Sequence, residues 1–322
     1  MIKIGSCAID TKVMLAPMSG CTDLPFRLIA REHGAKFCFF EMIDAHSVTH
    51  HRQKTLSMLK TLEEDRPIAL QILGNDPRII LSAAETILKS VKASFLDINA
   101  ACPVKKVIKK RAGAYLLKNG KMLCDTVKLL ASSLPLPITV KMRIGYEEGS
   151  QAHVADLAKK CEDSGASAIF VHGRTRPQHY SGTVDYNAIR AIKESVGIPV
   201  IGSGDVLSPQ LAKKMFDETG CDAILVARGS LGNPWIFEAI DGYLKDGSLP
   251  GPRSLDEVKK ALKRHLSYMH KHMECSEPGK VGVMRKTTLW YVRSFPRAKE
   301  KRGEISLVKS YEKMLESIDS IG

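Results

Sequence analysis

The sequence has few of the patterns that mark a membrane, secreted or metal-binding protein. No apolar run approaches the roughly 18 residues of a membrane span, and no basic stretch followed by an apolar one predicts a signal peptide. None of the eight cysteines lies in a Cys-x-x-Cys pair, which argues against zinc and iron–sulfur frameworks. Scattered thiols are typical of a reducing compartment. We therefore expect a cytoplasmic protein with no membrane anchor and no metal.

Two further patterns are missing from the chain. No internal repeat has a solenoid period. No Gly-x-Gly-x-x-Gly motif follows the first predicted strand, so the main sequence evidence for a dinucleotide-binding doubly wound sheet is missing. The 322 residues are 44% hydrophobic and 26% charged, which is typical of globular proteins and sufficient for one large and one small domain. Because no apolar heptad or patch is readable, we expect a monomer.

Positive charge is present in excess. The net charge is +13. Residues 251–322 carry 16 Lys and Arg against 9 Asp and Glu, so this part is about four times as basic per residue as the rest. Such an excess predicts a polyanionic partner.

Short β-rich runs alternate with amphipathic stretches up to about residue 250. Eight strands are predicted, over 13–18, 37–42, 68–73, 95–98, 138–143, 168–172, 199–202 and 223–226. Helices are predicted over 24–33, 78–91, 114–132, 152–164, 186–195 and 210–219, whereas 46–65 is irregular. This alternation predicts a (β/α)8 TIM barrel, with a doubly wound open sheet as the alternative.

A linker rich in proline and glycine, residues 247–254, follows the barrel. Beyond it, 255–273, 281–295 and 305–318 predict three helices, and Ser254 with Glu257 forms a capping-box pattern. We predict two domains: a catalytic barrel over residues 1–248 and a small, basic, all-helical domain over 249–322.

Polar side chains end strand after strand, and in a (β/α)8 barrel these ends form the C-terminal mouth, where active sites lie. After strands seven and eight the chain reads Gly202-Ser-Gly-Asp205 and Ala227-Arg-Gly229. Glycine N–H groups and Arg228 suit a phosphate group, whereas Asp205 would repel it, so we expect Asp205 to bind the loop backbone. The alternative is that these glycines only form tight turns.

Lys141 and Gln71 each end an apolar strand. A buried ammonium group without an anion is costly, and the N1–C2=O edge of a reduced flavin would offset that cost. The Gln71 amide suits the edge of a flavin or uracil ring. The alternative for both residues is pairing with a nearby carboxylate such as Asp97 in the barrel core.

A cysteine follows the fourth strand in Asn99-Ala-Ala-Cys102-Pro103, and five cations come after it: Lys105, Lys106, Lys109, Lys110 and Arg111. At pH 7 an ordinary thiol is only about 3% ionised, which favours Cys102 as a general acid. A nucleophile would need a base, and His172 could meet it only across the mouth. The alternative is a buried structural cysteine followed by a solvated helix face.

Seven short motifs, in this order along the chain, resemble the tRNA-dihydrouridine synthase family. They are Ala16-Pro-Met18, Asn99-x-x-Cys102-Pro103, Lys141-Met-Arg143, His172-Gly-Arg-Thr175, Gln178-x-Tyr180-x-Gly182, Gly202-x-Gly-Asp205 and Arg228-Gly229. The resemblance extends over essentially the whole chain and includes Met284-Arg285-Lys286 and Trp290-Tyr291. Each piece alone is short, but seven in register with a basic helical tail form a specific pattern.

The resemblance implies a flavin mononucleotide (FMN) barrel that NADPH, or NADH, reduces. Hydride would pass from flavin N5 to C6 of a tRNA uridine while Cys102 protonates C5. Asn99 and Arg143 would hold the flipped uracil and its phosphate. The implied flavin contacts are Ala16, Pro17, Met18, Gln71, Lys141, His172, Ser203, Gly204, Asp205, Ala227 and Arg228, and the further RNA contacts are Lys105, Lys106, Arg174, Arg285, Lys286 and Arg293.

Three positions depart from the family pattern. Ala101 and Ala227 stand where glycine is usual, and Ser203 stands where asparagine is common. All are small residues that keep their backbone donors, so we expect flavin binding to be retained. Two alternative functions remain: a flavin barrel that reduces a free pyrimidine, and an RNA-binding module with a vestigial flavin site.

The tail has a predicted cationic helix face. Seven residues advance a helix by about 20° less than two turns, so Lys286 and Arg293 are expected to share one face, with Arg285 beside it. Trp290 and Tyr291, on the same predicted helix, either pack the tail against the barrel or stack on a base.

Overall fold

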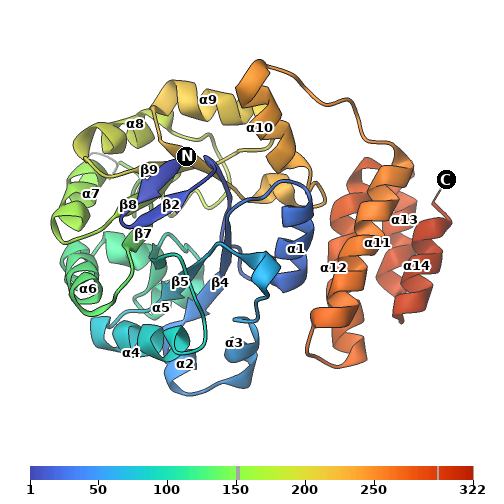
Figure 1. The fold of residues 1–322 in the computed structure, drawn as a ribbon, viewed down its shortest axis with the longest axis horizontal. Coiled ribbons are helices and arrows are strands. Elements are labelled where there is room, and N and C mark those ends of the chain that lie inside the picture. Colours follow the sequence, from blue (N-terminus) through green and yellow to red (C-terminus); the bar gives the residue numbers. More distant parts are fainter. Residues whose placement is uncertain (150–152, 296, 322) are drawn as a thin grey trace.

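Eight parallel strands form a barrel, which confirms the predicted fold class (Figure 1). The computed structural model describes residues 1–149, 153–295 and 297–321. The strands follow the order β3-β10-β9-β8-β7-β6-β5-β4, and Leu15 N donates to Phe37 O at 2.9 Å where the two edges meet. They span β3 (Val13–Leu15), β4 (Cys38–Asp44), β5 (Ile68–Leu73), β6 (Leu96–Ala100), β7 (Ile138–Arg143), β8 (Ala168–His172), β9 (Val200–Ser203) and β10 (Ala223–Val226).

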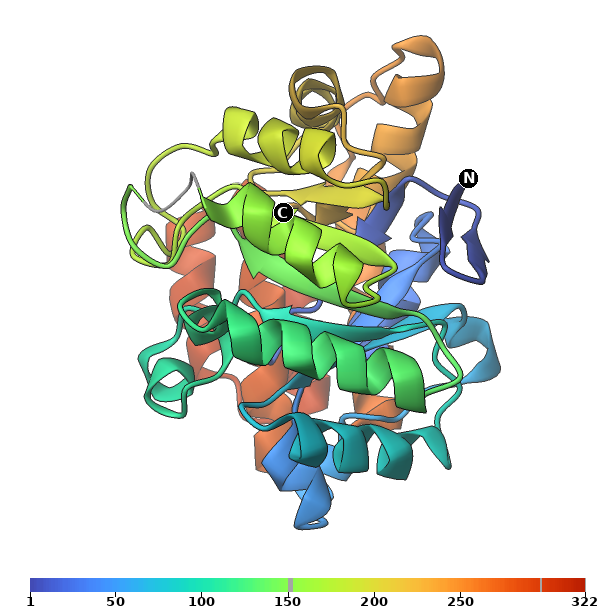
Figure 2. The same cartoon turned by 90° about the vertical axis from the view of Figure 1, so that its left-hand side faces the viewer.

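Helices surround the barrel (Figures 1 and 2). The longer ones are α1 (Leu24–Glu32), α4 (Pro77–Leu88), α6 (Gly120–Ser133), α7 (Val154–Asp163), α8 (Tyr186–Ser195), α9 (Pro209–Thr219) and α10 (Ile236–Asp246). Shorter turns lie in the loops: α2 (Ala45–Thr49), α3 (Gln53–Ser57), η1 (Glu63–Asp65), α5 (Lys105–Lys109), η2 (Gly113–Leu117) and η4 (Arg228–Ser230). The predicted helix 114–132 is two elements, because Asn119 caps a new helix by accepting from Met122 N at 3.3 Å.

Successive side chains of each strand point to opposite faces, so the barrel has two apolar cores, one between the strands and the helices and one in its interior. In β5, Ile68, Leu70 and Ile72 face the helices, whereas Ala69 faces the barrel interior. Four aromatic rings fill the lower interior, with centroids 5.3–5.9 Å apart: Phe37, Phe39, Phe95 and Phe170. A hairpin that the sequence did not predict, β1 (Ile2–Ile4) with β2 (Cys7–Ile9), packs on the same core. With this core filled by side chains, the open space of the barrel lies at the C-terminal ends of the strands.

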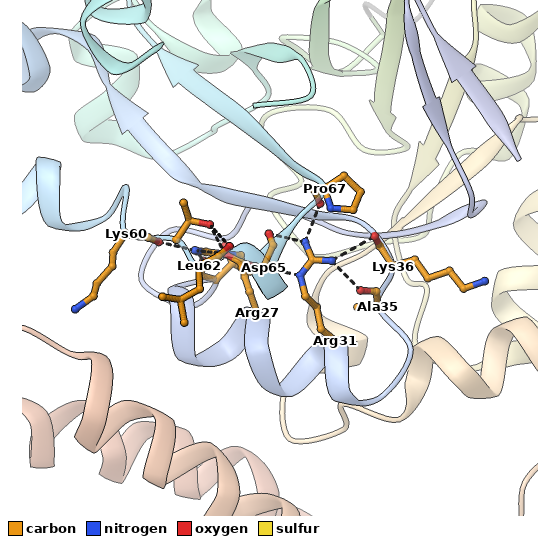
Figure 3. Close-up of polar contacts among 10 residues, drawn as sticks. Arg27, Arg31, Ala35, Lys36, Lys60, Leu62, Asp65 and Pro67 are labelled. Carbon is orange, nitrogen blue, oxygen red and sulfur yellow. Dashed lines mark hydrogen bonds and ion pairs between the residues drawn. The ribbon is translucent and has the colours of Figure 1, made fainter. Parts of the chain in front are cut away.

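A buried charge cluster joins α1 to the long β4–β5 connection (Figure 3). Asp65 accepts from Arg27 Nε at 2.9 Å and from Arg31 Nε at 3.1 Å, and the side chains of Asp65 and Arg27 are wholly buried. Arg27 also donates to the carbonyl oxygens of Thr22, at 2.7 Å, and Lys60, at 2.8 Å. One carboxylate thus organises the segment that had no readable pattern in the sequence.

Among the described residues after the linker, four α-helices stand where three were predicted: α11 (Leu255–His272), α12 (Glu277–Tyr291), α13 (Ala298–Leu307) and α14 (Tyr311–Asp319). The predicted capping box at Ser254 is present. A short turn, η5 (Val292–Ser294), follows α12, so the predicted helix 281–295 ends earlier than expected. The helices share one apolar cluster, to which Trp235 of the barrel also belongs. The domain boundary at residue 248 stays a prediction.

The tail packs against α1 (Figure 1). Glu32 pairs with Arg264 at 2.8 Å, and the ring of Phe26 meets that of Trp290 edge-on, with centroids 6.0 Å apart. In the part of the chain that the structure describes, no helix combines the length and apolar character needed to cross a membrane.

Candidate active site

A cavity of about 770 Å³ opens at the C-terminal mouth. It brings together residues predicted from seven separate strand ends: Ala16, Pro17, Met18, Gln71, Asn99, Cys102, Lys141, Arg143, His172, Ser203, Gly204, Asp205, Ala227 and Arg228, together with Lys106. The period-two alternation explains their convergence, because Gln71, Asn99 and Lys141 occupy the interior-facing positions above the aromatic core.

A chain of amide hydrogen bonds connects the barrel core to the cysteine loop. Gln71 Nε2 donates to Asp97 at 2.6 Å, and Asn99 Nδ2 donates to Gln71 Oε1 at 2.8 Å. The Asn99 Oδ1 atom in turn accepts from the backbone N–H groups of Ala101, at 3.1 Å, and Cys102, at 2.9 Å. Gln71 therefore does pair with Asp97, as the structural alternative held, and its remaining amide contact helps to fix the cysteine backbone.

Lys141 lies beside Asp97 without a direct bond to it. Asp97 is fully buried and accepts from Gln71 and from Thr139 Oγ1, the latter at 2.7 Å. Burial lowers the pKa of Lys141 below its usual value, although the charge of Asp97 opposes the shift. No described side chain or carbonyl accepts a hydrogen bond from the Lys141 ammonium, so its donors are available to a bound anionic group.

His172 presents a second unpartnered atom to the cavity. Its Nε2 is buried and has no hydrogen-bond partner among the described residues. Burial, followed by the charges of Lys141, Arg143, Arg174 and Arg228, holds the pKa of His172 well below its ordinary value. A neutral imidazole with an unsatisfied nitrogen is costly unless a ligand supplies the partner.

Arg143 connects the loops that border the cavity. Its guanidinium donates to the backbone oxygens of Ala101 at 2.8 Å, Thr175 at 2.9 Å and His179 at 3.0 Å. Burial lowers its pKa to about 10, so it keeps its charge at neutral pH. Arg143 thus holds the loop after β8 against the cysteine loop.

The loop after β9 differs from expectation at Asp205. Its carboxylate bridges two guanidinium groups, Arg174 at 2.5 Å and Arg228 at 2.7 Å, instead of binding the loop backbone. Arg174 is only 2% exposed and also donates to the carbonyls of Ser181 and Gly182. We therefore revise its role from RNA contact to loop support.

Cys102 lines the cavity as a half-buried thiol. Burial raises its pKa above the ordinary value, although a backbone hydrogen bond from Val104 and the charges of Arg143 and Lys141 oppose the shift. Behind it, Ala114 N donates to Cys102 O at 3.0 Å, and a Cβ on Gly113 would lie 2.7 Å from that oxygen. A protonated thiol on a fixed backbone suits a general acid.

The three predicted tail cations each bind a different backbone carbonyl. Arg285 donates to Ser306 O at 2.9 Å, Lys286 binds Gly20 O, and Arg293 donates to Leu231 O at 2.7 Å. Arg293 lies on η5 and not on α12, so the prediction that one helix carries all three cations was wrong. Trp290 packs on Phe26, and its neighbour Tyr291 is buried.

Sequence reasoning missed two residues of the cavity rim, Asp44 and Arg52, which both line the cavity. Asp44 pairs at 3.1 Å with Lys110, one of the five cations noted after Cys102. Arg52 comes from the irregular segment, which contains no regular apolar period. Lys105, on α5, is exposed beside this rim.

A family model described as dihydrouridine synthase matches residues 14–321. The chain belongs to the dihydrouridine synthase family. It is 35% identical over 318 residues to tRNA-dihydrouridine synthase B of Pseudomonas aeruginosa, covering 99% of this chain and 95% of that protein. It is likewise 35% identical over 309 residues to a probable tRNA-dihydrouridine synthase of Rickettsia conorii, covering 96% and 92%. The predicted enzyme class, an oxidoreductase, is confirmed.

Solved structures of lower identity share the fold. The old yellow enzyme of Trypanosoma cruzi superposes with a TM-score of 0.58 at 11% identity, covering 78% of this chain and 93% of that one. A morphinone reductase mutant in complex with tetrahydroNAD gives a TM-score of 0.56 at 13% identity, covering 78% and 91%. At these identities the likeness shows the fold alone.

Proposed function

We propose that this protein reduces the C5=C6 bond of uridine in tRNA, with FMN as cofactor and NADPH or NADH as electron donor. The observation that carries the proposal is one cavity that Cys102, Lys141 and His172 line together, in a member of the dihydrouridine synthase family. Among the described residues, neither the Lys141 ammonium nor His172 Nε2 has a hydrogen-bond partner. We also propose a cytoplasmic monomer.

The cavity fits a flavin on chemical grounds. Lys141 offers an ammonium group to a negatively charged ring edge, and His172 Nε2 can bond a ring or ribityl group. Ser203 and Gly204, with Arg228 beside them, provide N–H groups and charge for a phosphate. When bound, a reduced flavin supplies the hydride that reaches C6 of the uracil.

Cys102 supplies the proton. Its raised pKa keeps Sγ protonated at neutral pH, so the thiol can give its proton to C5 as charge develops there. Arg143 and Lys141 lower the cost of the thiolate that remains, and solvent at the open mouth can return the proton. Asn99 keeps the thiol in position through its two backbone contacts.

The proposed RNA surface combines the mouth and the tail. A uridine within folded tRNA must be unstacked to enter a cavity of this kind. Lys105 and Lys106 lie at the rim, Lys286 and Arg293 lie where the tail meets the barrel, and Arg285 lies within the tail, beside α13. These cations provide for phosphate contacts on both sides of the flipped nucleotide.

A flavin enzyme for a free pyrimidine is the second candidate, since the cavity alone would serve one. The basic tail favours tRNA, because a small substrate needs no such surface. Incubation with NADPH and either unmodified tRNA or free uracil separates the two. We expect NADPH oxidation that depends on tRNA; oxidation with uracil alone at an equal rate would favour the second candidate.

Replacement of Lys141 by methionine is expected to reduce flavin retention or slow flavin reduction. In the parent protein, flavin affinity should fall as pH rises, at a pH below the ordinary lysine value of 10.5, because the ammonium loses its proton early. The variant should lack this pH dependence. Titration of the apoprotein with FMN at several pH values, followed by absorbance, measures flavin affinity and its pH dependence. An unchanged flavin occupancy and an unchanged rate of flavin reduction would leave Lys141 with only a structural role beside Asp97.

Gly113→Ala is expected to slow turnover by about tenfold to a hundredfold, because the new methyl group displaces the Cys102 backbone. Gly220→Ala is a matched control, because the two glycines have nearly the same φ, +65° at Gly220 and +64° at Gly113. A Cβ added at Gly220, however, would have no atom within 4 Å. Flavin content and the KM for tRNA should not change in either. Equal losses in both variants would assign the effect to backbone strain.

The variant Arg285→Ala/Lys286→Ala/Arg293→Ala is expected to stay folded and to retain its flavin but to bind tRNA more weakly. Each lost phosphate contact should reduce the salt slope of binding by roughly 0.7–0.9. Lys213→Ala/Lys214→Ala, on α9, removes charge elsewhere and should leave the slope unchanged. A parental affinity and slope in the triple variant would mean that RNA docks at another surface.

A further inference from the structure

A second cavity, of about 1070 Å³, lies outside the barrel between α6 and α7. Figure 2 shows these two helices side by side and running in the same direction. The cavity is lined by Cys124 and by four lysines, Lys118, Lys121, Lys128 and Lys160, against three carboxylates, Glu147, Asp156 and Asp163. Nothing in the proposed reaction uses this region, yet it presents a half-buried thiol to solvent.

Cys124 has a second cysteine directly beneath it. At Gly120 the helices approach so closely that a Cβ would lie 2.9 Å from Leu157 Cδ1. One turn further along each helix, four residues on, come Cys124 and Cys161. Their thiols are hydrogen-bonded to each other, and Cys161 is fully buried.

We propose that Cys124 and Cys161 form a thiol–disulfide exchange site, in which Cys124 reacts with low-molecular-weight disulfides and Cys161 resolves the product. The Cys124 thiolate attacks one sulfur of the small disulfide, forms a mixed disulfide and releases one thiolate. Cys161 then gives up its proton, attacks the Cys124 sulfur and releases the second thiol. Two protein thiols are oxidised by two electrons, and one small disulfide is reduced to two thiols.

The surroundings of Cys124 favour its role as the attacking thiol. The hydrogen bond from Cys161 is the main reason that the pKa of Cys124 lies below the ordinary value; the Ser164 hydroxyl and Lys160 act in the same direction, against burial and Asp125. The same hydrogen bond keeps the proton on Cys161, whose pKa is raised. The four lysines that line the cavity exceed its three carboxylates by one charge, which suits a negatively charged disulfide such as that of glutathione.

Glutathione disulfide is the probe, added to the holoprotein, with remaining thiols alkylated and each cysteine followed by mass spectrometry. We expect a Cys124–Cys161 disulfide in the parent and a stable mixed disulfide on Cys124 in Cys161→Ala. Cys161 should stay reduced in Cys124→Ala. A thiol with a pKa near 6 should react about twofold faster at neutral pH than an ordinary exposed thiol, because its larger thiolate fraction outweighs its lower nucleophilicity.

Cys275, exposed on the tail, is the internal control for an ordinary surface thiol. Oxidation of Cys275 while Cys124 and Cys161 remain reduced would overturn the proposal. It would also fail if Cys161 were modified as readily in Cys124→Ala as in the parent. An unchanged flavin spectrum and melting temperature show that each variant is folded, so neither result depends on the proposed RNA reaction.

Discussion

Cys102→Ala is expected to lose roughly 10²–10⁴-fold in product formation, the range typical of a missing general acid. Flavin content, flavin reduction by NADPH and tRNA affinity should stay near the parental values, because the thiol contributes one proton and no positioning contact. Single-turnover measurement of dihydrouridine, starting from the reduced enzyme, isolates the affected step.

Cys21→Ala provides the matched control for this variant. Cys21 also lines the cavity as a partly buried thiol, and burial raises its pKa as well. Turnover should therefore stay near parental in Cys21→Ala. Parental turnover in Cys102→Ala, or equal losses in both variants, would refute the assignment of Cys102 as the acid.

Asp65→Asn is expected to destabilise the protein by about 3–5 kcal/mol, the cost typical of a broken buried ion pair. The change leaves the buried Arg27 guanidinium without its carboxylate and weakens the hold on Arg31 (Figure 3). The segment before β5 and the loop at Thr22 should loosen together, because Arg27 contacts both. Urea unfolding, followed by circular dichroism, measures the loss.

Glu63→Gln in the same turn is the control for the buried pair. Glu63 pairs with Arg66 at 2.8 Å, but its side chain is 84% exposed, so the loss should stay below about 1 kcal/mol. Comparable losses in the two variants would contradict the account of the Asp65 cluster. A parental free energy of unfolding in Asp65→Asn would do so as well.

The barrel and most of its mouth could be predicted because they depend on local periods. Alternation places Gln71, Asn99 and Lys141 on the interior side of strands whose bounds were nearly correct, and the predicted capping box at Ser254 was confirmed. These features depend on residues that are close to one another in the sequence. Their convergence follows from the closure of the barrel.

Contacts between distant segments could not be predicted. Asp205 was expected to bind its own loop, but Arg174 and Arg228 come from two other strand ends and satisfy it. The helix period predicted that Arg293 lies on the same helix as Lys286, and this prediction failed because α12 ends at Tyr291. The segment 46–65 has no regular spacing of apolar residues, because its structure depends on the buried Asp65 carboxylate, which Arg27 of α1 contacts.

The most direct test of the central claim is dihydrouridine itself. Purified protein with FMN and NADPH is given unmodified tRNA, and the nucleosides of the digested RNA are measured by mass spectrometry. We predict that specific uridines gain two hydrogens, and that Cys102→Ala, loaded with the same flavin, forms little of this product. Unchanged uridine in tRNA that the reduced, flavin-loaded parent protein binds would contradict the proposed function.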